Sequence, residues 1–295
     1  MTDSVLPQNP SERIPASRRD WTRLMSDLQI RPNKGLGQHF LFERGIVERM
    51  VRVAGVTSSD TVVEIGPGLG ILTSELLRKA GHVVAIELDR NLAAHLRRTF
   101  GDLPNLTLVE NNVMSVDLDL FLPPSGPYDV VANLPYSLGS AILRHLLESP
   151  RPPRRLTIML QKEVAERVVA SPPDMSILAV ATQFYAKPYI AFDVSPTVFI
   201  PPPKVESAVL TLEVHKQPPL PQRFHPLFFR IVTAGFRQKR KQVANSIADV
   251  LRLPKTDVSQ WLELAGIDPM RRAETLAVAD WVRLTETAPA AVTAG

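Results

Sequence analysis

The sequence contains no cysteine among its 295 residues. This absence excludes disulfide bonds, thiolate metal ligands and a cysteine nucleophile. It is compatible with a reducing cytoplasm, where we expect the protein to work. The sequence also has no apolar run long enough to cross a bilayer, and the segment from Met1 to Arg19 lacks the apolar stretch of a secretory signal. We therefore expect neither a membrane anchor nor an export signal.

Aromatic residues are scarce, at 6% of the chain, whereas proline is frequent, with 27 residues. The 44% hydrophobic and 22% charged content are typical of a soluble globular protein. The length suits one large domain or two ordinary ones. We predict an N-terminal extension over 1–30 that is partly disordered, in which residues 20–25 could start a short helix. A sheet domain is predicted over 31–216, a proline-rich linker over 217–221, a helical domain over 222–286 and a flexible tail over 287–295.

Positive charge is concentrated at the two ends of the chain, although the formal net charge is only +4 and the pI is about 9.5. Six basic residues stand near the amino end: Arg13, Arg18, Arg19, Arg23, Arg31 and Lys34. A second basic run, with Arg237, Lys239, Arg240 and Lys241, stands towards the carboxyl end. The middle is acidic by comparison. This pattern suits a polyanion gripped from two sides, while the alternative is ordinary solubilising charge.

A strand–turn–helix–strand pattern occupies the first third of the chain. Residues 61–65 are apolar and β-branched and predict a buried strand. The turn 66–70 reads Gly-x-Gly-x-Gly, residues 71–80 have helical periodicity, and 82–86 form a second apolar strand that ends at Glu87. Glycines at such a turn allow the backbone to approach a ligand closely at a helix N-terminus.

The glycine spacing argues against NAD and FAD, because Ile71 stands where the dinucleotide fingerprint has its third glycine. An acidic residue about 20 positions after the turn, here Glu87, can accept hydrogen bonds from both hydroxyls of a ribose. Glu64 before the turn and Glu87 after it together favour S-adenosylmethionine as the cofactor. The alternative is a glycine turn with a purely structural role.

The remaining patterns predict an α/β fold, namely a Rossmann-like sheet of the S-adenosylmethionine-dependent methyltransferase type followed by a small all-helical C-terminal domain. Further strands are expected at 106–109, 128–133, 155–160, 189–194 and 207–214. Helices are expected at 44–54, 91–100, 140–149 and 162–170, and in the C-terminal domain at 226–237, 242–252, 257–265 and 279–285.

The segment Asn133-Leu134-Pro135-Tyr136 follows the strand predicted at 128–133. The carboxyl ends of strands in such a sheet are where ligands bind. The Asn133 amide oxygen and the Pro135 carbonyl can both accept hydrogen bonds from one amino group, and the Tyr136 ring offers a stacking face for a base. The alternative is a simple strand-to-helix turn with a serine as N-cap.

Six motifs occur in an order that resembles the small-subunit ribosomal RNA dimethyladenosine transferases, the KsgA type. The motifs are Lys34-Gly35-Leu36-Gly37-Gln38-His39-Phe40-Leu41, Glu64-Ile65-Gly66-Pro67-Gly68-Leu69-Gly70, Glu87-Leu88-Asp89, Asn133-Leu134-Pro135-Tyr136, Pro201-Pro202-Pro203-Lys204-Val205-Glu206-Ser207 and Phe236-Arg237-Gln238-Lys239-Arg240-Lys241. The resemblance covers the chain from about Lys34 to about Trp281.

The resemblance implies an enzyme that transfers two methyl groups from S-adenosyl-L-methionine to the N6 atom of each of two adjacent adenines. These adenines lie in a hairpin near the 3′ end of the small-subunit (16S) rRNA. The implied partner is small-subunit rRNA within a pre-30S particle. We expect a monomer that needs neither a metal nor a membrane.

Roles for individual residues also follow from the resemblance. Carried over by position, the cofactor residues are His39, Leu41, Gly66, Glu87, Asn112 and Asn133; the catalytic residues are Asn133, Leu134, Pro135, Tyr136 and Phe199; and the RNA-binding residues are Lys34, Lys204, Arg237, Lys239, Arg240 and Lys241. Tyr136 and Phe199 are expected to stack on the two faces of the flipped base, although for Phe199 taken alone packing in the core is the favoured alternative. His39 stands where the family often has Asn, and Asn112 stands where it usually has Asp, so we expect somewhat weaker cofactor binding.

Three other functions remain open. A large-subunit rRNA adenine methyltransferase of the macrolide-resistance type shares the fold and chemistry, although residues 34–41 and 201–207 favour the small-subunit enzyme. A non-catalytic RNA-binding assembly factor is the second, and the intact Glu87 and residues 133–136 argue against it. DNA adenine methylation is the third, but that chemistry usually has an acidic residue in place of Asn133.

Overall fold

The computed structural model of the chain describes residues 7–30, 32, 37–238 and 240–293. It divides into two compact units. The first comprises Met1–Ala165 and Tyr189–Val214, and the second comprises Glu166–Pro188 and His215–Gly295. In the part of the chain that the structure describes, no helix is both long and apolar enough to pass through a lipid bilayer.

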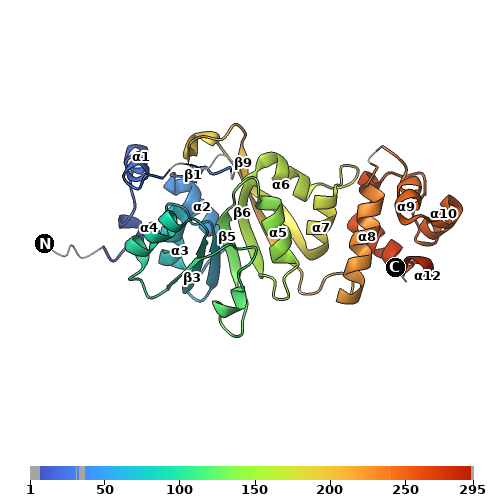
Figure 1. Cartoon of the computed structure of the whole chain (residues 1–295), viewed down its shortest axis with the longest axis horizontal. Helices are drawn as coiled ribbons and strands as arrows, with labels where there is room; N and C mark the ends of the chain where they lie inside the picture. Colours follow the sequence, from blue (N-terminus) through green and yellow to red (C-terminus); the bar gives the residue numbers. More distant parts are fainter. Residues whose placement is uncertain (1–6, 31, 33–36, 239, 294–295) are drawn as a thin grey trace. The chain divides into compact units, whose positions relative to one another are not determined.

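A seven-stranded sheet forms the core of the first unit, in the order β4-β3-β2-β5-β6-β9-β7 (Figure 1). The strands are β2 (Thr61–Ile65), β3 (His82–Glu87), β4 (Leu106–Glu110), β5 (Asp129–Asn133), β6 (Arg155–Gln161), β7 (Ala186–Val194) and β9 (Ser207–Val214). Strands β2 to β6 are parallel, and β9 runs antiparallel to β6. The order reverses direction between β2 and β5, which is where such sheets bind ligands. The predicted Rossmann-like sheet is confirmed.

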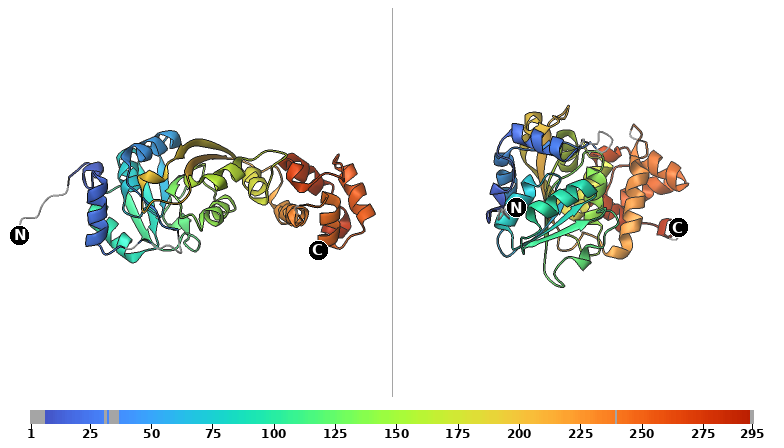
Figure 2. Two further views of the ribbon diagram at one scale, coloured as in Figure 1. Left: turned by 90° about the horizontal axis from the view of Figure 1, so that it is seen from above. Right: turned by 60° about the vertical axis from the view of Figure 1, so that its left-hand side comes forward.

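Helices cover both faces of this sheet (Figures 1 and 2). One face carries α2 (Arg44–Ala54), α3 (Ile71–Lys79) and α4 (Arg90–Phe100), and the other carries α5 (Gly139–Leu147). The buried residues of α2, α4 and α5 recur at helical spacing and give each helix one apolar side, whereas α3 is buried on all sides from Ile71 to Leu77. Short 3₁₀ turns lie at Leu118–Leu120 and Pro196–Val198.

The segment before the sheet is folded over residues 7–30, where the sequence analysis placed a partly disordered extension. A 3₁₀ turn (Pro10–Glu12) is followed by α1 (Arg18–Asp27), whose N-cap Ser17 accepts a hydrogen bond from the Asp20 amide. Trp21 and Met25, four positions apart on α1, are 1% and 7% exposed and belong to the hydrophobic core of the first unit. Burial of these two large side chains attaches the helix to the sheet domain.

A small second sheet joins distant parts of the first unit. Strand β1 (Phe40–Leu41) pairs antiparallel with β8 (Phe199–Ile200). Each strand has only two residues, which is too short for a periodic pattern, and the sequence analysis predicted neither. The pairing brings Phe40 and Leu41, which follow the segment 34–37, close to the proline-rich segment 201–206.

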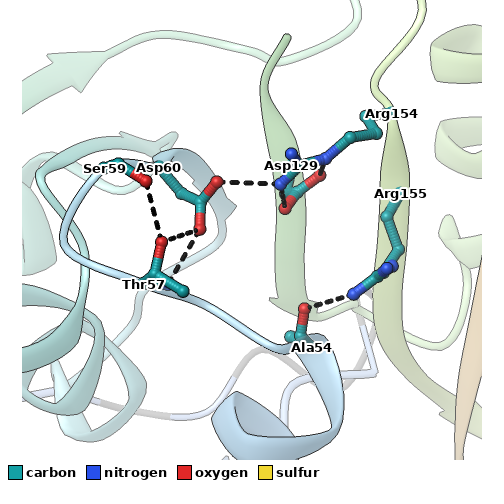
Figure 3. Close-up of polar contacts among 7 residues, drawn as sticks. All are labelled: Ala54, Thr57, Ser59, Asp60, Asp129, Arg154 and Arg155. Atoms are coloured by element: carbon teal, nitrogen blue, oxygen red, sulfur yellow. Dashed lines mark hydrogen bonds and ion pairs between the residues drawn. The ribbon is translucent and has the colours of Figure 1, made fainter.

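The amino ends of the central strands are tied together by ion pairs, which Figure 3 shows. The Arg154 guanidinium contacts the Asp129 carboxylate at 2.6 Å and the Asp60 carboxylate at 2.8 Å, and Arg155 donates to the Ala54 carbonyl at 2.8 Å. Burial alone would raise the pKa of Asp60, but hydrogen bonds from Thr57 and Arg154 outweigh it and lower that pKa. This network stabilises the sheet edge opposite the carboxyl ends of the parallel strands.

The second unit is helical. It contains α7 (Ile177–Tyr185), a 3₁₀ turn (Gln222–Phe224), α8 (His225–Phe236), α9 (Val243–Leu251), α10 (Lys255–Leu264), a 3₁₀ turn (Ala273–Thr275), α11 (Val278–Glu286) and α12 (Ala290–Thr293), while α6 (Lys162–Val169) crosses the boundary between the units. The sequence analysis placed residues 166–188 in the sheet domain and missed α7. Contacts group these residues with the helices, because the Phe184 ring stacks on Phe228 with centroids 4.3 Å apart. The tail expected to be flexible contains α12, whose Val292 is buried.

Candidate active site

A pocket opens at the carboxyl ends of β2, β3 and β5. Its walls come from four stretches that lie far apart in the sequence: residues 37–41, 64–72, 87–92 and 133–138. Parallel strands end at one edge of a sheet, so the residues that follow them are brought together there. Eight of the predicted site residues line this pocket: His39, Leu41, Gly66, Glu87, Asn133, Leu134, Pro135 and Tyr136.

The floor of the pocket is the glycine turn between β2 and α3. Gly66, Gly68 and Gly70 all have positive φ, at 66°, 60° and 89°, which side-chain-bearing residues rarely adopt. A Cβ added at Gly66 would meet nothing within 4 Å, whereas one at Gly70 would lie 2.7 Å from Phe100 Cε2. The turn thus leaves open space above Gly66 and is packed tightly at Gly70.

We expect Gly70→Ala to lower the free energy of unfolding by about 2–4 kcal/mol, because it adds a steric clash with Phe100 to the strain of a positive φ. Gly266→Ala is the matched control, because Gly266 has φ 73° but open space around a Cβ, so only backbone strain of about 1–2 kcal/mol applies. Urea denaturation measures both. Equal losses in the two variants would contradict the assigned packing role of Gly70.

Glu87 ends β3 and is 5% exposed. Its Oε2 accepts a hydrogen bond from the Gly68 amide at 3.0 Å and its Oε1 accepts one from the Asp89 amide at 2.9 Å. Burial raises the pKa of this carboxyl above its ordinary value, against the opposing effect of these bonds. The backbone bonds fix the carboxylate against the glycine turn and leave each oxygen a further lone pair for a ligand hydroxyl.

Glu64 in β2 is the second buried carboxyl that lines the pocket, and it is 1% exposed. Its Oε2 is buried and has no hydrogen-bond partner among the described residues. Burial raises the pKa of Glu64 to about 8, with the nearby Glu87 carboxylate adding to the rise and the hydroxyl and amide of the neighbouring Thr73 opposing it. A buried acid of this kind is stabilised in its charged form when a cation or hydrogen-bond donor enters the pocket.

Asn133 is the last residue of β5, where its backbone is paired with Met159 of β6. Its Nδ2 donates a hydrogen bond to the His39 carbonyl at 3.4 Å. This bond sets the orientation of the amide, so that Oδ1 is the group left to accept a hydrogen bond from a substrate. Sequence reasoning predicted the acceptor but not the residue that orients it.

Pro135 and Tyr136 complete this side of the pocket. The Pro135 carbonyl accepts from the Leu138 amide at 3.0 Å and keeps a second lone pair. The Tyr136 hydroxyl is hydrogen-bonded to the buried Ser207 Oγ at the start of β9, which anchors the far end of the ring. The His39 ring lies 5.2 Å from the Tyr136 ring, tilted by 35°, and its Nδ1 is 2.8 Å from the Pro201 carbonyl.

Two of the predicted catalytic and cofactor residues do not line the pocket. Phe199 is 0% exposed, lies in β8 and belongs to the hydrophobic core of the first unit. In this structure its ring has no face free for a base, because core packing takes both. Asn112 is exposed, and its Oδ1 accepts a hydrogen bond from the Met114 amide at 3.0 Å. This hydrogen bond stabilises the turn that follows β4.

The predicted RNA-binding residues are on the surface wherever the structure describes them. Lys204 in the first unit and Arg237, Arg240 and Lys241 in the second are exposed. Lys34 and Lys239 lie outside the described residues. The polar contact between His39 and Pro201 brings the segment that carries Lys204 close to the pocket.

Several residues that shape the pocket were not singled out from the sequence. Leu88 is 55% exposed and Leu138 is 37% exposed, and both line the pocket as apolar walls. Gly37, with φ 64°, would place an added Cβ 3.4 Å from the Tyr136 Cβ. Ser207 belongs to a recognised motif, but its contact with Tyr136 spans 71 residues of sequence. Local patterns give no signal for such a contact.

Comparison with known proteins agrees with this geometry. The family model described as "Ribosomal RNA adenine dimethylase" matches residues 30–289. The chain belongs to this family. A relative from Moorella thermoacetica, named ribosomal RNA small subunit methyltransferase A, is 40% identical over 276 residues, which cover 90% of this chain and 95% of the relative. A relative of the same name from Dehalococcoides mccartyi strain BAV1 is 38% identical over 88% of this chain and 90% of its own length.

Two solved structures share the fold. A dimethyladenosine transferase from Plasmodium falciparum superposes with a TM-score of 0.69 at 25% identity, covering 83% of this chain and 96% of the other. The 23S rRNA methyltransferase ErmE superposes with a TM-score of 0.68 at 28% identity, covering 84% and 98%. The predicted family, and with it a methyltransferase that modifies rRNA, is confirmed.

Proposed function

We propose that this protein transfers methyl groups from S-adenosyl-L-methionine to N6 of two adjacent adenines in the 3′-terminal hairpin of small-subunit rRNA, during small-subunit biogenesis. The observation that carries the proposal is the Asn133 amide, which the His39 carbonyl holds with its oxygen available at the pocket. The relatives of 38–40% identity that bear a small-subunit enzyme's name support the choice of rRNA.

The pocket fits S-adenosyl-L-methionine on four counts. The open space above Gly66 admits a ligand close to the backbone, and the Glu87 carboxylate is placed for ribose hydroxyls. Leu88 offers an apolar face for a base. The unpartnered Glu64 Oε2 and the raised pKa of Glu64 suit a ligand with positive charge. When bound, this cofactor supplies a methyl group attached to a positively charged sulfur.

The protein's own contribution is to prepare the adenine amino group. That nitrogen is a poor nucleophile, because its lone pair is delocalised into the purine ring. Hydrogen bonds from the two amino protons to Asn133 Oδ1 and the Pro135 carbonyl favour a pyramidal nitrogen whose lone pair is localised. The two acceptors are fixed before substrate binds, so they need no reorganisation during the reaction.

Tyr136 serves as the stacking face for the extruded adenine. Base extrusion costs a few kcal/mol, and stacking on an aromatic ring offsets part of that cost. The bond from Tyr136 to Ser207 holds the ring in place. We assign the stacking to Tyr136 alone, since the Phe199 ring is buried in the core.

The exposed cations Lys204, Arg237, Arg240 and Lys241 are proposed to contact rRNA phosphates, and His39 and Leu41 to border the cofactor. The contact of Asn112 with the cofactor's adenine amino group, which the resemblance implies, would use the second lone pair of Asn112 Oδ1, because the first accepts from the Met114 amide. We further propose that the enzyme acts as a cytoplasmic monomer on a pre-30S particle. No group of three or more His, Cys, Asp or Glu side chains in the described chain is arranged to hold a metal.

A large-subunit rRNA adenine methyltransferase is the second candidate, because the structure is similar to that of ErmE. The two functions share the pocket chemistry and differ in the RNA that reaches it. The identity and coverage of the small-subunit relatives favour the first.

The deciding experiment offers the full-length protein three substrates with radiolabelled S-adenosyl-L-methionine. These are purified undermethylated small subunits, undermethylated large subunits and free rRNA. We expect incorporation into small subunits, with dimethyladenosine mapped by primer extension to two adjacent adenines. Incorporation into large subunits alone would establish the second candidate and contradict the first.

A further inference from the structure

His39 contacts two of the residues that we assign to the target adenine. Its backbone carbonyl accepts the hydrogen bond from Asn133 Nδ2 at 3.4 Å, and its imidazole ring lies 5.2 Å from the Tyr136 ring, measured between centroids. All three residues line the same pocket. The imidazole therefore lies beside the place where Asn133 and Tyr136 hold the base, and its role need not end at the cofactor.

A hydrogen bond on one side of the His39 ring determines which ring nitrogen carries the proton. Nδ1 lies 2.8 Å from the Pro201 carbonyl oxygen. A carbonyl oxygen only accepts hydrogen bonds, so Nδ1 must be the nitrogen that donates. In the neutral ring the basic lone pair is then on Nε2, which can accept a proton. The contact with Pro201 thus sets the tautomer of His39.

Methyl transfer to an amino group releases a proton. The N6 lone pair forms a bond to the methyl carbon, and the carbon–sulfur bond breaks with its electron pair left on sulfur. N6 is then positively charged and still carries the hydrogens that it had before. One hydrogen must leave as H⁺ before the methylated amino group is neutral. An adenine that receives two methyl groups releases two protons in this way.

Few groups at the pocket can take up these protons. Asn133 Oδ1 and the Pro135 carbonyl bind the amino hydrogens, but amide oxygens are too weakly basic to keep a proton at neutral pH. A proton acceptor must be a side chain that titrates. Among the described residues that line the pocket, these are His39, Glu64, Glu87 and Tyr136.

Three of these four side chains have other roles or are already protonated. Glu87 is held against the glycine turn, and both Glu87 and Glu64 are assigned to the cofactor. The Tyr136 hydroxyl is hydrogen-bonded to Ser207 Oγ, and burial raises the pKa of this phenol, which keeps it protonated at neutral pH. Histidine is the side chain that exchanges a proton most readily near neutral pH, which leaves His39 as the acceptor.

We propose that His39 Nε2 accepts the proton that the adenine amino group loses at each methyl transfer. This inference rests on the proposed function, which brings an adenine to the pocket. The products of the step are a neutral methylated adenine and an imidazolium ring. The ring is only half-buried, so it can pass the proton on to water before the second transfer. His39 thus acts as a general base.

The first test measures the tautomer in the absence of any reaction. Nitrogen-15 NMR of the cofactor-free, full-length protein labelled at histidine separates Nδ1–H rings from Nε2–H rings. The spectrum of His39→Asn identifies the His39 signals among those of the six histidines. Above about pH 8, where histidine rings are neutral, we expect the His39 proton on Nδ1. A proton on Nε2 would overturn the inference, because that nitrogen could not accept another.

The second test follows the single-turnover rate of methyl transfer to small subunits between about pH 5 and pH 9, at saturating cofactor. Near pH 8 we expect His39→Asn to be roughly 10- to 100-fold slower than the wild type. This is at or below the lower end of the range for general bases, because both acceptors of the amino group remain. Asparagine keeps the backbone carbonyl that orients Asn133 and offers Pro201 a side-chain donor, but it cannot take up a proton.

The pH dependence separates proton acceptance from packing. As the pH falls through the range in which histidine binds a proton, about 8 to 5, the wild-type rate should approach that of His39→Asn, because an imidazolium has no lone pair. Other groups near His39 also titrate or carry charge, but they are present in both proteins, so the ratio of the two rates reports on His39. These groups are Glu64, Glu87, Tyr136, Lys204 and Glu206.

His215→Asn is the matched control, since it removes an exposed histidine of the second unit that does not line the pocket. It should reproduce the wild-type rate at every pH. A His39→Asn rate that equals the wild-type rate near pH 8, or one that is slower by the same factor at every pH, would overturn the inference. The second of these results would assign His39 a packing role beside Tyr136.

Failure of the inference and failure of the proposed function give different results. If the wild type methylates small subunits and the ratio of the two rates does not change with pH, only the role of His39 is refuted. If the wild type transfers no methyl group to any RNA, the proposed function falls and the inference falls with it.

Discussion

Asn133→Ala should lower the rate of methyl transfer at saturating substrates by about 100-fold or more. Its Oδ1 is one of two acceptors that we assign to the adenine amino group, and losing one preorganised hydrogen-bond partner in a polar active site has an effect of this size. The affinity for S-adenosyl-L-methionine should change much less, because the Glu87 carboxylate and the glycine turn remain. Single-turnover methylation of undermethylated small subunits measures the rate, and calorimetry measures the affinity.

Asn133→Asp is the matched comparison. It keeps an acceptor oxygen but loses the Nδ2 that donates to the His39 carbonyl. If acceptance from the amino group is what matters, the Asp variant should keep more activity than the Ala variant. An Ala variant as fast as the wild type would refute the role of Asn133. Ala and Asp variants that are equally slow would assign the loss to the His39 contact instead.

The fold could be predicted from the sequence where the pattern is long and periodic. The strands at 61–65, 82–87 and 155–161 are apolar runs bounded by turns, and each forms at its predicted place within one residue. Because parallel strands end at one edge, the polar residues after β2, β3 and β5 could be assigned to a common site. Glu87 and Asn133 were found in this way, and both line the pocket.

The parts that sequence reasoning missed depend on contacts between distant residues. Strands β1 and β8 are two residues long each, so they produce no periodic pattern in the sequence from which they could be predicted. That pairing helps to bury Phe199 in the core, whereas the family resemblance implied a stacking role for its ring. The N-terminal segment looks disordered from its composition, yet Trp21 and Met25 attach it to the core. Helix α7 is apolar on most sides, and a short run of apolar residues is compatible with either a buried helix or a buried strand, so the sequence did not predict this helix.

Glu64→Gln should make the cofactor-free protein more stable than the wild type at pH 8.5. The pKa of Glu64 is about 8 in the folded chain and near 4.5 when unfolded. The stability linked to its protonated form is therefore fully present below pH 4.5 and is lost as the pH rises through 8. The two pKa values differ by about 3.5 units, so at about 1.4 kcal/mol per unit the loss is on the order of 5 kcal/mol. Glutamine at this position does not titrate, so urea denaturation should show the variant's advantage at pH 8.5 shrinking towards pH 5.

The same substitution should weaken cofactor binding, because the positively charged ligand loses a buried carboxylate. A hydrogen bond to a charged group contributes about 1.5–3 kcal/mol, so we expect roughly a 10- to 100-fold higher Kd for S-adenosyl-L-methionine. Glu48→Gln, at an exposed position on α2, is the control and should change neither the pH profile nor the Kd. If Glu64→Gln followed the wild-type pH curve, Glu64 would not be the titrating group. If its stability rose while the Kd stayed constant, the carboxylate would be a buried acid without a part in cofactor binding.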